Sequence, residues 1–268
     1  MKFDAAIAII PARYSSTRFP GKPIAEIDGK TLIEHVYRRV EQASLVDRIV
    51  VATDDRRIAD AVERFGGTAI MTRNDHPSGT DRLAEAAGEL DPDTLVVNVQ
   101  GDEPLVEPVI IDQAITAARL GDADVVTLMT RLDPDDANNP NRVKVVVDRN
   151  GIALYFSRSR IPSSGTCFLH LGLYAYTVRF LKKFTRLQRT PLEIAERLEQ
   201  LRALEHGYRI RVVEVESQSW GIDTPADLER FRELQGRKPE ARIQKPEGRD
   251  PSRLTSGFRL LASGFPRD

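Results

Sequence analysis

The sequence contains very little cysteine. Cys167 is the one cysteine among 268 residues. A single thiol excludes an internal disulfide and argues against a metal site built from cysteines. Chains without disulfides are typical of reducing compartments, so we expect this protein in the cytoplasm.

Long apolar runs and an excess of one charge are also missing. The N-terminal apolar run covers about six residues before Pro11 and Arg13, whereas a membrane span needs roughly twenty and a signal peptide a longer core than this. Lys and Arg number 39 and Asp and Glu 40, a formal net charge of -1. These features predict no membrane insertion and no nucleic-acid partner.

The residues that are present predict a folded α/β protein. Hydrophobic residues make up 41% and charged residues 29% of the chain, which is typical of globular domains. Short apolar runs alternate with segments of helical spacing, a pattern that favours a mostly parallel sheet flanked by helices. The expected strands are Ala6–Ile10, Arg48–Ala52, Thr94–Val99, Val125–Met129, Arg142–Val147 and Ile210–Val215; the expected helices are Thr31–Ala43, Arg56–Phe65, Asp81–Leu90, Glu107–Leu120 and Pro191–His206.

Two regions depart from this alternation. Residues 150–176 are aromatic and β-branched, which predicts antiparallel or mixed strands in a smaller second lobe. Residues 237–268 are rich in Pro, Gly, Ser and Arg, and this composition predicts a disordered or loosely docked tail. We expect one domain over 1–236, with lobes at about 1–130 and 131–215 and a return segment at about 216–236.

The loop after the first strand has the composition of a phosphate site. Arg13, Lys22 and an arginine between them lie among small residues within ten positions. Cations and turned backbone amides together bind polyphosphates. In parallel sheets, ligands bind beyond the carboxyl ends of the strands, where this loop begins. We therefore favour a phosphate site over a solvated basic loop.

Two familiar phosphate motifs are not present. Gly29-Lys30-Thr31 resembles the end of a P-loop, but Ile24 stands where that motif needs its first glycine. No Gly-x-Gly-x-x-Gly follows an expected strand. We interpret Gly29-Lys30-Thr31 as a turn that leads into a helix.

Two aspartates are candidate ligands of a hard cation. Asp102 follows an apolar strand through the flexible Gly101, and Asp223 lies in Gly221-Ile222-Asp223-Thr224-Pro225. Carboxylates at strand ends suit a cation that also binds phosphate. Either residue could instead be a helix cap, and Asp-Thr-Pro is a common helix start.

Several segments in one order resemble the 3-deoxy-manno-octulosonate (Kdo) cytidylyltransferase family. They are PARYSSTRFPGKP, MTRNDHPSGTDRL, VNVQGDEP, FSRSRIP, HLGLYAY, LEQLR and GIDTPADLE, and the resemblance covers roughly residues 5–235. The first segment alone is typical of the wider sugar nucleotidyltransferases, whereas the full set is specific. The resemblance implies a nucleotide-diphospho-sugar transferase-like fold.

The resemblance also implies roles for individual residues. It places Arg13, Lys22, Asp102 and Asp223 in catalysis, the two aspartates as ligands of Mg²⁺. The implied CTP-binding residues are Ala12, Arg13, Ser15, Ser16, Lys22, Arg73, Ser78, Gly79, Thr80 and Gln100. The implied sugar-binding residues are Gln100, Arg158, His170, Tyr174, Glu199 and Gln200. From spacing alone, His170 and Tyr174 could equally face a core, and Arg158, Glu199 and Gln200 could be surface residues.

The implied activity is transfer of CMP from CTP to Kdo for lipopolysaccharide synthesis, by a homodimeric enzyme. The alternatives are another sugar acid (8-amino-Kdo or a sialic acid), a nucleotide-sugar glycosyltransferase, and a nucleotide-binding regulator. Residues 163–169 are shorter than the corresponding family segment, which bears on the sugar pocket and the dimer.

Overall fold

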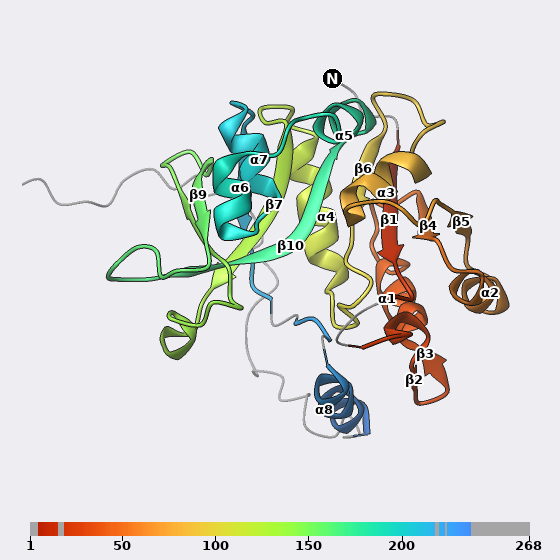
Figure 1. Cartoon of the computed structure of the whole chain (residues 1–268). Coiled ribbons are helices and arrows are strands. Elements are labelled where there is room, and N and C mark those ends of the chain that lie inside the picture. Colours follow the sequence, from red (N-terminus) through yellow and green to blue (C-terminus); the bar gives the residue numbers. More distant parts are fainter. Residues whose placement is uncertain (1–4, 16–18, 218–219, 223, 237–268) are drawn as a thin grey trace, which may run out of the picture.

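The computed structural model describes residues 5–15, 19–217, 220–222 and 224–236 (Figure 1). Within them, a nine-stranded sheet has the order β11-β7-β10-β6-β1-β4-β5, with β8 pairing β10 and β9. The strands are β1 (Ala6–Ala12), β2 (Glu26–Ile27), β3 (Lys30–Thr31), β4 (Arg48–Thr53), β5 (Ala69–Met71), β6 (Leu95–Asn98), β7 (Val125–Arg131), β8 (Lys144–Val147), β9 (Ala153–Ser157), β10 (Phe168–Thr177) and β11 (Ile210–Glu214). The helices are η1 (Lys22–Ile24), α1 (Leu32–Val40), α2 (Arg56–Arg64), α3 (Gly79–Ala86), α4 (Pro108–Ala118), η2 (Pro134–Asp136), α5 (Val178–Phe184), α6 (Pro191–Glu196), α7 (Gln200–Glu205) and α8 (Pro225–Gly236).

The strands β6, β1, β4 and β5 form a parallel half-sheet. Because successive side chains of a strand point to opposite faces, β1 supplies both sides of the core. Ile7 and Ile9 belong to one buried cluster, and Ala8 and Ile10 to the other. The predicted parallel sheet covered on both faces is confirmed.

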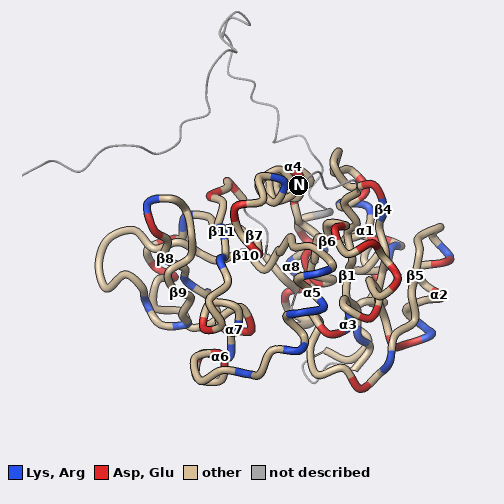
Figure 2. The backbone as a smooth tube through the Cα atoms, turned by 90° about the horizontal axis from the view of Figure 1, so that it is seen from above, with Lys and Arg blue, Asp and Glu red and all other residues tan. Residues whose placement is uncertain are grey.

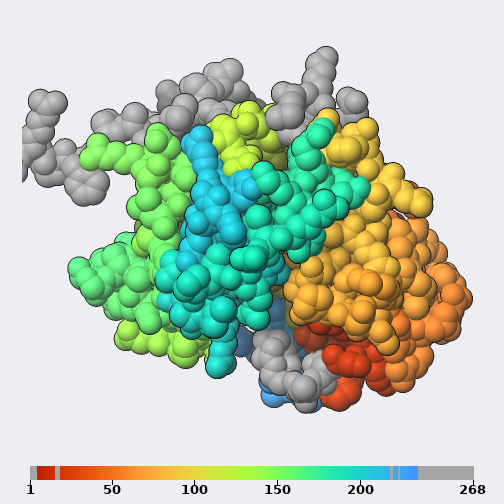
Figure 3. Space-filling view, turned by 45° about the horizontal axis from the view of Figure 1, so that its top comes forward, coloured from red at the N-terminus to blue at the C-terminus, as the bar shows by residue number. Residues whose placement is uncertain are grey.

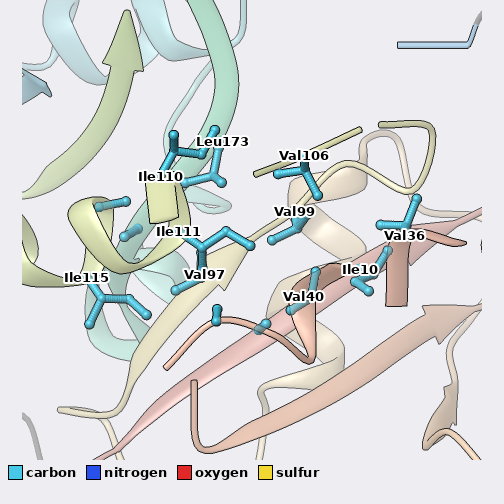
Figure 4. Packing of buried hydrophobic residues seen from close by; sticks show 14 of the residues in the cluster. Ile10, Val36, Val40, Val97, Val99, Val106, Ile110, Ile111, Ile115 and Leu173 are labelled. Atoms are coloured by element: carbon cyan, nitrogen blue, oxygen red, sulfur yellow. The ribbon is translucent and has the colours of Figure 1, made fainter. Parts of the chain in front are cut away.

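The two clusters are covered by different helices. Helices α1, α2 and α4 pack on the face of Ile10, where Figure 4 shows Val36, Val97 and Ile111 among the interlocking side chains. Helices α3, α5 and α7 contribute Leu83, Leu181 and Leu201 to the opposite cluster, with Ile9. Burial on both faces explains why the strand sequences are continuously apolar rather than alternating.

The long strand β10 makes the sheet mixed. It lies between β6 and β7 and is antiparallel to both, and at Phe168 and Leu169 it also pairs with β8. The register shifts between Leu171 and Tyr174, around Gly172. The predicted antiparallel or mixed strands in residues 150–176 are confirmed. One of them, β10, is also a central strand of the large sheet.

The prediction of a single helix from Pro191 to His206 was wrong. The structure has α6 and α7, separated at Arg197, whose φ of 55° is left-handed. A left-handed residue ends a helix because the next residues cannot continue its hydrogen-bond ladder. The buried carboxylate of Glu193 accepts hydrogen bonds from the Arg202 guanidinium at 2.6 and 2.8 Å and so ties α7 to α6.

Helix α8 packs on the β2–β3 hairpin at the end of the sheet (Figure 1). Ile27, Leu32, Ile222, Leu228 and Phe231 form a separate buried cluster there. The expected lead into a helix is confirmed, since Thr31 caps α1 by accepting the Glu34 amide. Of the predicted turn, however, only Gly29 lies in a turn, whereas Lys30 and Thr31 form β3.

Charge is distributed over the molecule. In Figure 2, Lys and Arg are interspersed with Asp and Glu along the described part of the tube. In the described part of the chain, no helix is long and apolar enough to cross a membrane.

Candidate active site at the carboxyl ends of the strands

The loop after β1 is closed by Gly21. The Gly21 amide donates to the Tyr14 carbonyl at 2.9 Å, and a Cβ on Gly21 would lie 3.3 Å from the Tyr14 ring. Gly21 also has a φ of 72°, which glycine adopts without strain. Of the loop residues implied in CTP binding, Ala12 is buried and Ser15 exposed, while Ser16 lies outside the described residues.

Arg13 directly follows β1, at the carboxyl end of this central strand, and is half-buried. Burial and the nearby Arg82 guanidinium lower its pKa, while the carboxylates of Asp54, Asp81 and Glu199 act in the opposite direction. Arg13 therefore lies among groups from the ends of β4, α3 and α7. A partly desolvated arginine in such surroundings can bind an anion more strongly than one in water.

Asp102 lies opposite this loop, beyond β6. Gly101 permits a close approach to β1, because a Cβ there would lie 2.7 Å from the Pro11 carbonyl oxygen. The Asp102 carboxylate accepts a hydrogen bond from Lys22 Nζ at 2.6 Å. Helix α4 begins later, with Glu107 at its N-cap position. Asp102 is therefore no helix cap.

The second candidate aspartate, Asp223, lies outside the described residues. The described residue Ile222 lies beside Asp102: its amide donates to the Asp102 carbonyl at 2.8 Å, and its carbonyl accepts from Lys22 Nζ at 2.8 Å. The hydroxyl of Thr224 accepts the Asp227 amide at 3.2 Å. The capping role at the start of α8 thus belongs to Thr224.

The arrangement around Asp102 fits a hard cation. A carboxylate and the Ile222 carbonyl present two oxygens to one positive group, the Lys22 ammonium. Among the described residues, no three His, Cys, Asp or Glu side chains gather into a metal site. Mg²⁺ suits such a site because it commonly takes one or two carboxylates and completes its shell with water and phosphate.

The implied CTP-binding residues Arg73, Ser78, Gly79 and Thr80 belong to a segment that leads into α3. Ser78 caps this helix by accepting the Asp81 amide, and Gly79 lies against the Pro11 ring. Arg73 is exposed, and its backbone amide donates to the Glu85 carboxylate. The first turn of α3 therefore lies beside the end of β1, whereas the Arg73 side chain is exposed to solvent.

A buried arginine that sequence reasoning missed supports this segment. Arg82 is 0% exposed, and its guanidinium donates to Asp54 Oδ2 at 3.0 Å and to the Thr72 hydroxyl. These bonds join α3 to the ends of β4 and β5. Its sequence signal was its place in SGTDRL, but a charged residue on an amphipathic helix predicts an exposed side chain.

Of the residues that the resemblance implies in sugar binding, His170 and Tyr174 lie together on β10. Their ring centroids are 5.5 Å apart, and the Phe156 ring lies 4.9 Å from His170. Burial lowers the pKa of His170 to about 3, so the imidazole is neutral, and it raises the pKa of Tyr174. His170 Nε2 lies 2.9 Å from the Thr127 hydroxyl oxygen.

Gln100 connects the loop after β6 with strand β10. Its side-chain amide donates to the Gly172 carbonyl at 2.8 Å, and a Cβ on Gly172 would lie 3.5 Å from Gln100 Cγ. The irregularity of β10 at Gly172 thus holds the loop after β6 against the strand that carries His170 and Tyr174.

Glu199 joins α7 to α3. The Thr80 hydroxyl donates to Glu199 Oε2 at 2.5 Å, and the chain from α5 to α7 lies against α3 on the face seen in Figure 3. A cavity of about 40 Å³ lies behind this contact, next to Tyr174 and Gln200. Gln200 is buried, and its Nε2 has no hydrogen-bond partner within the described chain.

Arg158 is held by the backbone. Its guanidinium donates to the carbonyls of Glu196, Pro140 and Arg197 at 2.9, 3.1 and 3.5 Å. The Arg158 amide donates to the Glu196 carboxylate at 2.9 Å. The structure thus pairs Lys22 with Asp102 and Thr80 with Glu199, joins Gln100 to Gly172 on β10, and places Arg158 beside α6.

Comparison with known proteins agrees with this geometry. The family model described as cytidylyltransferase matches residues 7–210. A 3-deoxy-manno-octulosonate cytidylyltransferase of Geobacter metallireducens is 53% identical over 245 residues, which cover 84% of this chain and 96% of that protein. The protein of the same name from Trichlorobacter lovleyi is also 53% identical, over 85% of this chain and 97% of its own length.

Solved structures give the same result. A CMP:2-keto-3-deoxy-manno-octonic acid synthetase complexed with CTP matches with a TM-score of 0.84 and 44% identity, over 87% of this chain and 99% of that one. A putative glucose-1-phosphate thymidylyltransferase from Bacillus anthracis, 17% identical with a TM-score of 0.62 over 86% and 95%, shares the fold. The predicted fold class is confirmed, and the chain belongs to the 3-deoxy-manno-octulosonate cytidylyltransferase family.

Proposed function

We propose that this protein transfers CMP from CTP to Kdo, giving CMP-Kdo and pyrophosphate. The observation that carries the proposal is that charged and polar side chains follow the neighbouring parallel strands β1 and β6 at their carboxyl ends. Arg13 and Lys22 follow β1, Asp102 follows β6, and Gln100 joins them to β10. The names of relatives about half identical over most of the chain support the same substrate pair.

In this proposal the 2-hydroxyl of Kdo attacks the α-phosphorus of CTP. An oxygen–phosphorus bond forms, the bond to the bridging oxygen of pyrophosphate breaks, and the hydroxyl proton goes to solvent. Arg13 and Lys22 bind the triphosphate and offset the charge that grows on the leaving pyrophosphate. Positioning and charge neutralisation dominate nucleotidyl transfer, so the chain needs no obligatory side-chain base.

We propose Mg²⁺ as the cofactor, held by Asp102 and, as the family resemblance implies, by Asp223. When bound, it would polarise the α-phosphate and acidify the attacking hydroxyl. The two oxygens around the Lys22 ammonium support this choice. Turnover should cease in excess chelator and return with added Mg²⁺; equal rates with and without chelator would contradict a metal requirement.

The sugar acid would bind between β10 and α7. Tyr174, Glu199 and Gln200 lie near one another there, and His170 is next to Tyr174. Burial keeps the imidazole of His170 neutral, and hydroxyl-rich ligands suit neutral hydrogen-bonding groups. His170 would therefore orient the sugar rather than transfer a proton.

One assay tests the function. Pyrophosphate release should require both CTP and Kdo, with 8-amino-Kdo and N-acetylneuraminate as competing acceptors. Mass spectrometry should identify CMP-Kdo as the product. Faster turnover of another sugar acid would move the proposal to that substrate, and CTP consumption without any sugar acid would overturn it.

We also propose a cytoplasmic homodimer. Strand β9 pairs only with β8 among the described strands, and Leu154 on it and Ile194 on α6 are 62% and 57% exposed. A strand edge of this kind can pair with a second chain, and exposed apolar side chains would favour such a contact. Sedimentation velocity should give twice the monomer mass; a monomer at micromolar concentration would contradict the dimer.

A further inference from the structure

Lys22 lies on the oxygen atoms that a metal ion would need. Its Nζ is 2.6 Å from Asp102 Oδ2 and 2.8 Å from the Ile222 carbonyl oxygen. A Mg²⁺ ion binds oxygen at about 2.0–2.1 Å. An ammonium held on this carboxylate disfavours a divalent cation at the same oxygen atoms, because the two positive charges repel each other in a partly buried site.

The position of Lys22 is fixed from several sides. Its backbone belongs to η1, where its carbonyl accepts the Ala25 amide at 3.1 Å. Ile222 is 0% exposed in the cluster with α8, and its amide donates to the Asp102 carbonyl. The Lys22 side chain is only 15% exposed. Three segments distant in the sequence therefore hold the ammonium on Asp102.

Moving the ammonium has an electrostatic cost that an anion can offset. A partly buried lysine that leaves its carboxylate without a new partner is an uncompensated charge. Triphosphate oxygens are strong acceptors for an ammonium, and Lys22 is the residue that we place on them. The nucleotide thus offers Lys22 a second partner within the same site.

We propose that Lys22 competes with the divalent cation for Asp102 and gives up this carboxylate when CTP supplies phosphate oxygens. The inference rests on the proposed function and deepens it. Lys22 then has two roles, as the counter-ion of Asp102 before the nucleotide binds and as a phosphate ligand afterwards. The consequence is that CTP and the metal bind cooperatively, while the protein alone binds the metal weakly.

The test measures metal binding without turnover. Mn²⁺ is titrated into the nucleotide-free protein, and free Mn²⁺ is followed by electron paramagnetic resonance. We expect Lys22→Met, which removes the charge and keeps the length of the side chain, to bind Mn²⁺ at least about tenfold more tightly than wild type. Lys30→Met is the matched control, because Lys30 is an exposed residue of β3, and it should bind like wild type.

A second variant tests whether the increase in Mn²⁺ affinity depends on Asp102. Asp102→Asn added to Lys22→Met should remove the increased affinity; an increase that survives would place the ion elsewhere and overturn the proposal. Equal or weaker Mn²⁺ binding by Lys22→Met would overturn it as well. If thermal melting shows that Lys22→Met is unfolded, Lys22→Gln replaces it under the same criteria. Because neither CTP nor sugar acid is present, failure of the proposed reaction would leave this result standing.

Discussion

The proposed nucleotide side and the proposed sugar side of this site are built from different kinds of elements. Arg13 and Lys22 lie on one loop after β1, and Asp102 follows the neighbouring strand β6. The sugar side takes His170 and Tyr174 from β10, Glu199 and Gln200 from the start of α7, and Arg158 from the segment after β9. The proposed nucleotide side thus uses loops that follow strands, whereas the proposed sugar side takes side chains from within a strand and from the start of a helix.

The polar groups of the two sides also differ in their surroundings. Lys22 and Asp102 form a partly exposed ion pair, and Arg13 is half-buried among charges. On the sugar side, burial lowers the pKa of His170 and raises that of Tyr174. Charged residues on short loops suit a highly charged ligand, whereas neutral buried groups suit a ligand rich in hydroxyls.

The largest effect that we expect is on the nucleotide side. Asp102→Asn should lower kcat at least about a hundredfold, the usual scale for losing an electrostatic group in the transition state. The melting temperature should fall only modestly, because the Lys22–Asp102 ion pair is partly exposed and the amide oxygen of the introduced asparagine can still accept a hydrogen bond. Asp60→Asn on the exposed face of α2 is the control. Near-normal turnover by Asp102→Asn would remove this residue from the chemistry, and the same prediction applies to Asp223→Asn.

Arg158→Ala should separate the two sides. We expect the KM for the sugar acid to rise about tenfold to a hundredfold and the KM for CTP to stay nearly constant. The reason is that a guanidinium held by three backbone carbonyls is preorganised, and its remaining N–H groups can bind the sugar carboxylate. Steady-state kinetics with each substrate varied in turn would decide this.

Arg149→Ala, in the turn before β9, is the control for that experiment, because Arg149 is exposed. A lower melting temperature with unchanged KM values would make Arg158 a purely structural clamp. A selective loss of CTP affinity would contradict the division of the site into nucleotide and sugar sides.

The buried imidazole should make stability depend on pH. The pKa of His170 is about 3 in the folded chain and about 6.5 in the unfolded chain, so between these values only the unfolded chain takes up the proton. Stability from this group is complete above pH 6.5 and falls as the pH drops, by roughly 2 kcal/mol at pH 5. Urea unfolding from pH 7 to 5 should show this loss in wild type and not in His170→Gln.

His206→Gln serves as the control, because His206 is exposed on the C-terminal side of α7. It should keep the pH dependence of wild type. An equal loss of stability in His170→Gln would assign the pH dependence to other groups.

The smallest effect concerns the contact between the two sides. The bond from Thr80 to Glu199 should give a coupling energy of about 1 kcal/mol in a double-mutant cycle with Thr80→Val and Glu199→Met. Chemical unfolding of the four proteins measures it. Additive effects within about 0.5 kcal/mol would mean that α3 and α7 pack beside each other without energetic coupling.

Much of the nucleotide side could be predicted because each of its loops follows a recognisable apolar strand. Apolar strands with charged loops after them locate the edge of a parallel sheet, and the specific order of motifs identified the family. The same reasoning failed for the helix from Pro191 to His206, because its break is at Arg197, a residue without a helix-breaking propensity. It also missed Arg82, whose burial depends on Asp54 and Thr72.

The sequence by itself determined the family, the parallel half-sheet and the candidate residues, because periodicity and motifs are properties of neighbouring positions. The tertiary structure decided which partners those residues have. It placed Lys22 on Asp102, 80 positions away, and Thr80 on Glu199, 119 positions away. It also fixed Arg158 on three carbonyls. Such contacts depend on how strands and helices pack, and no local pattern encodes that packing.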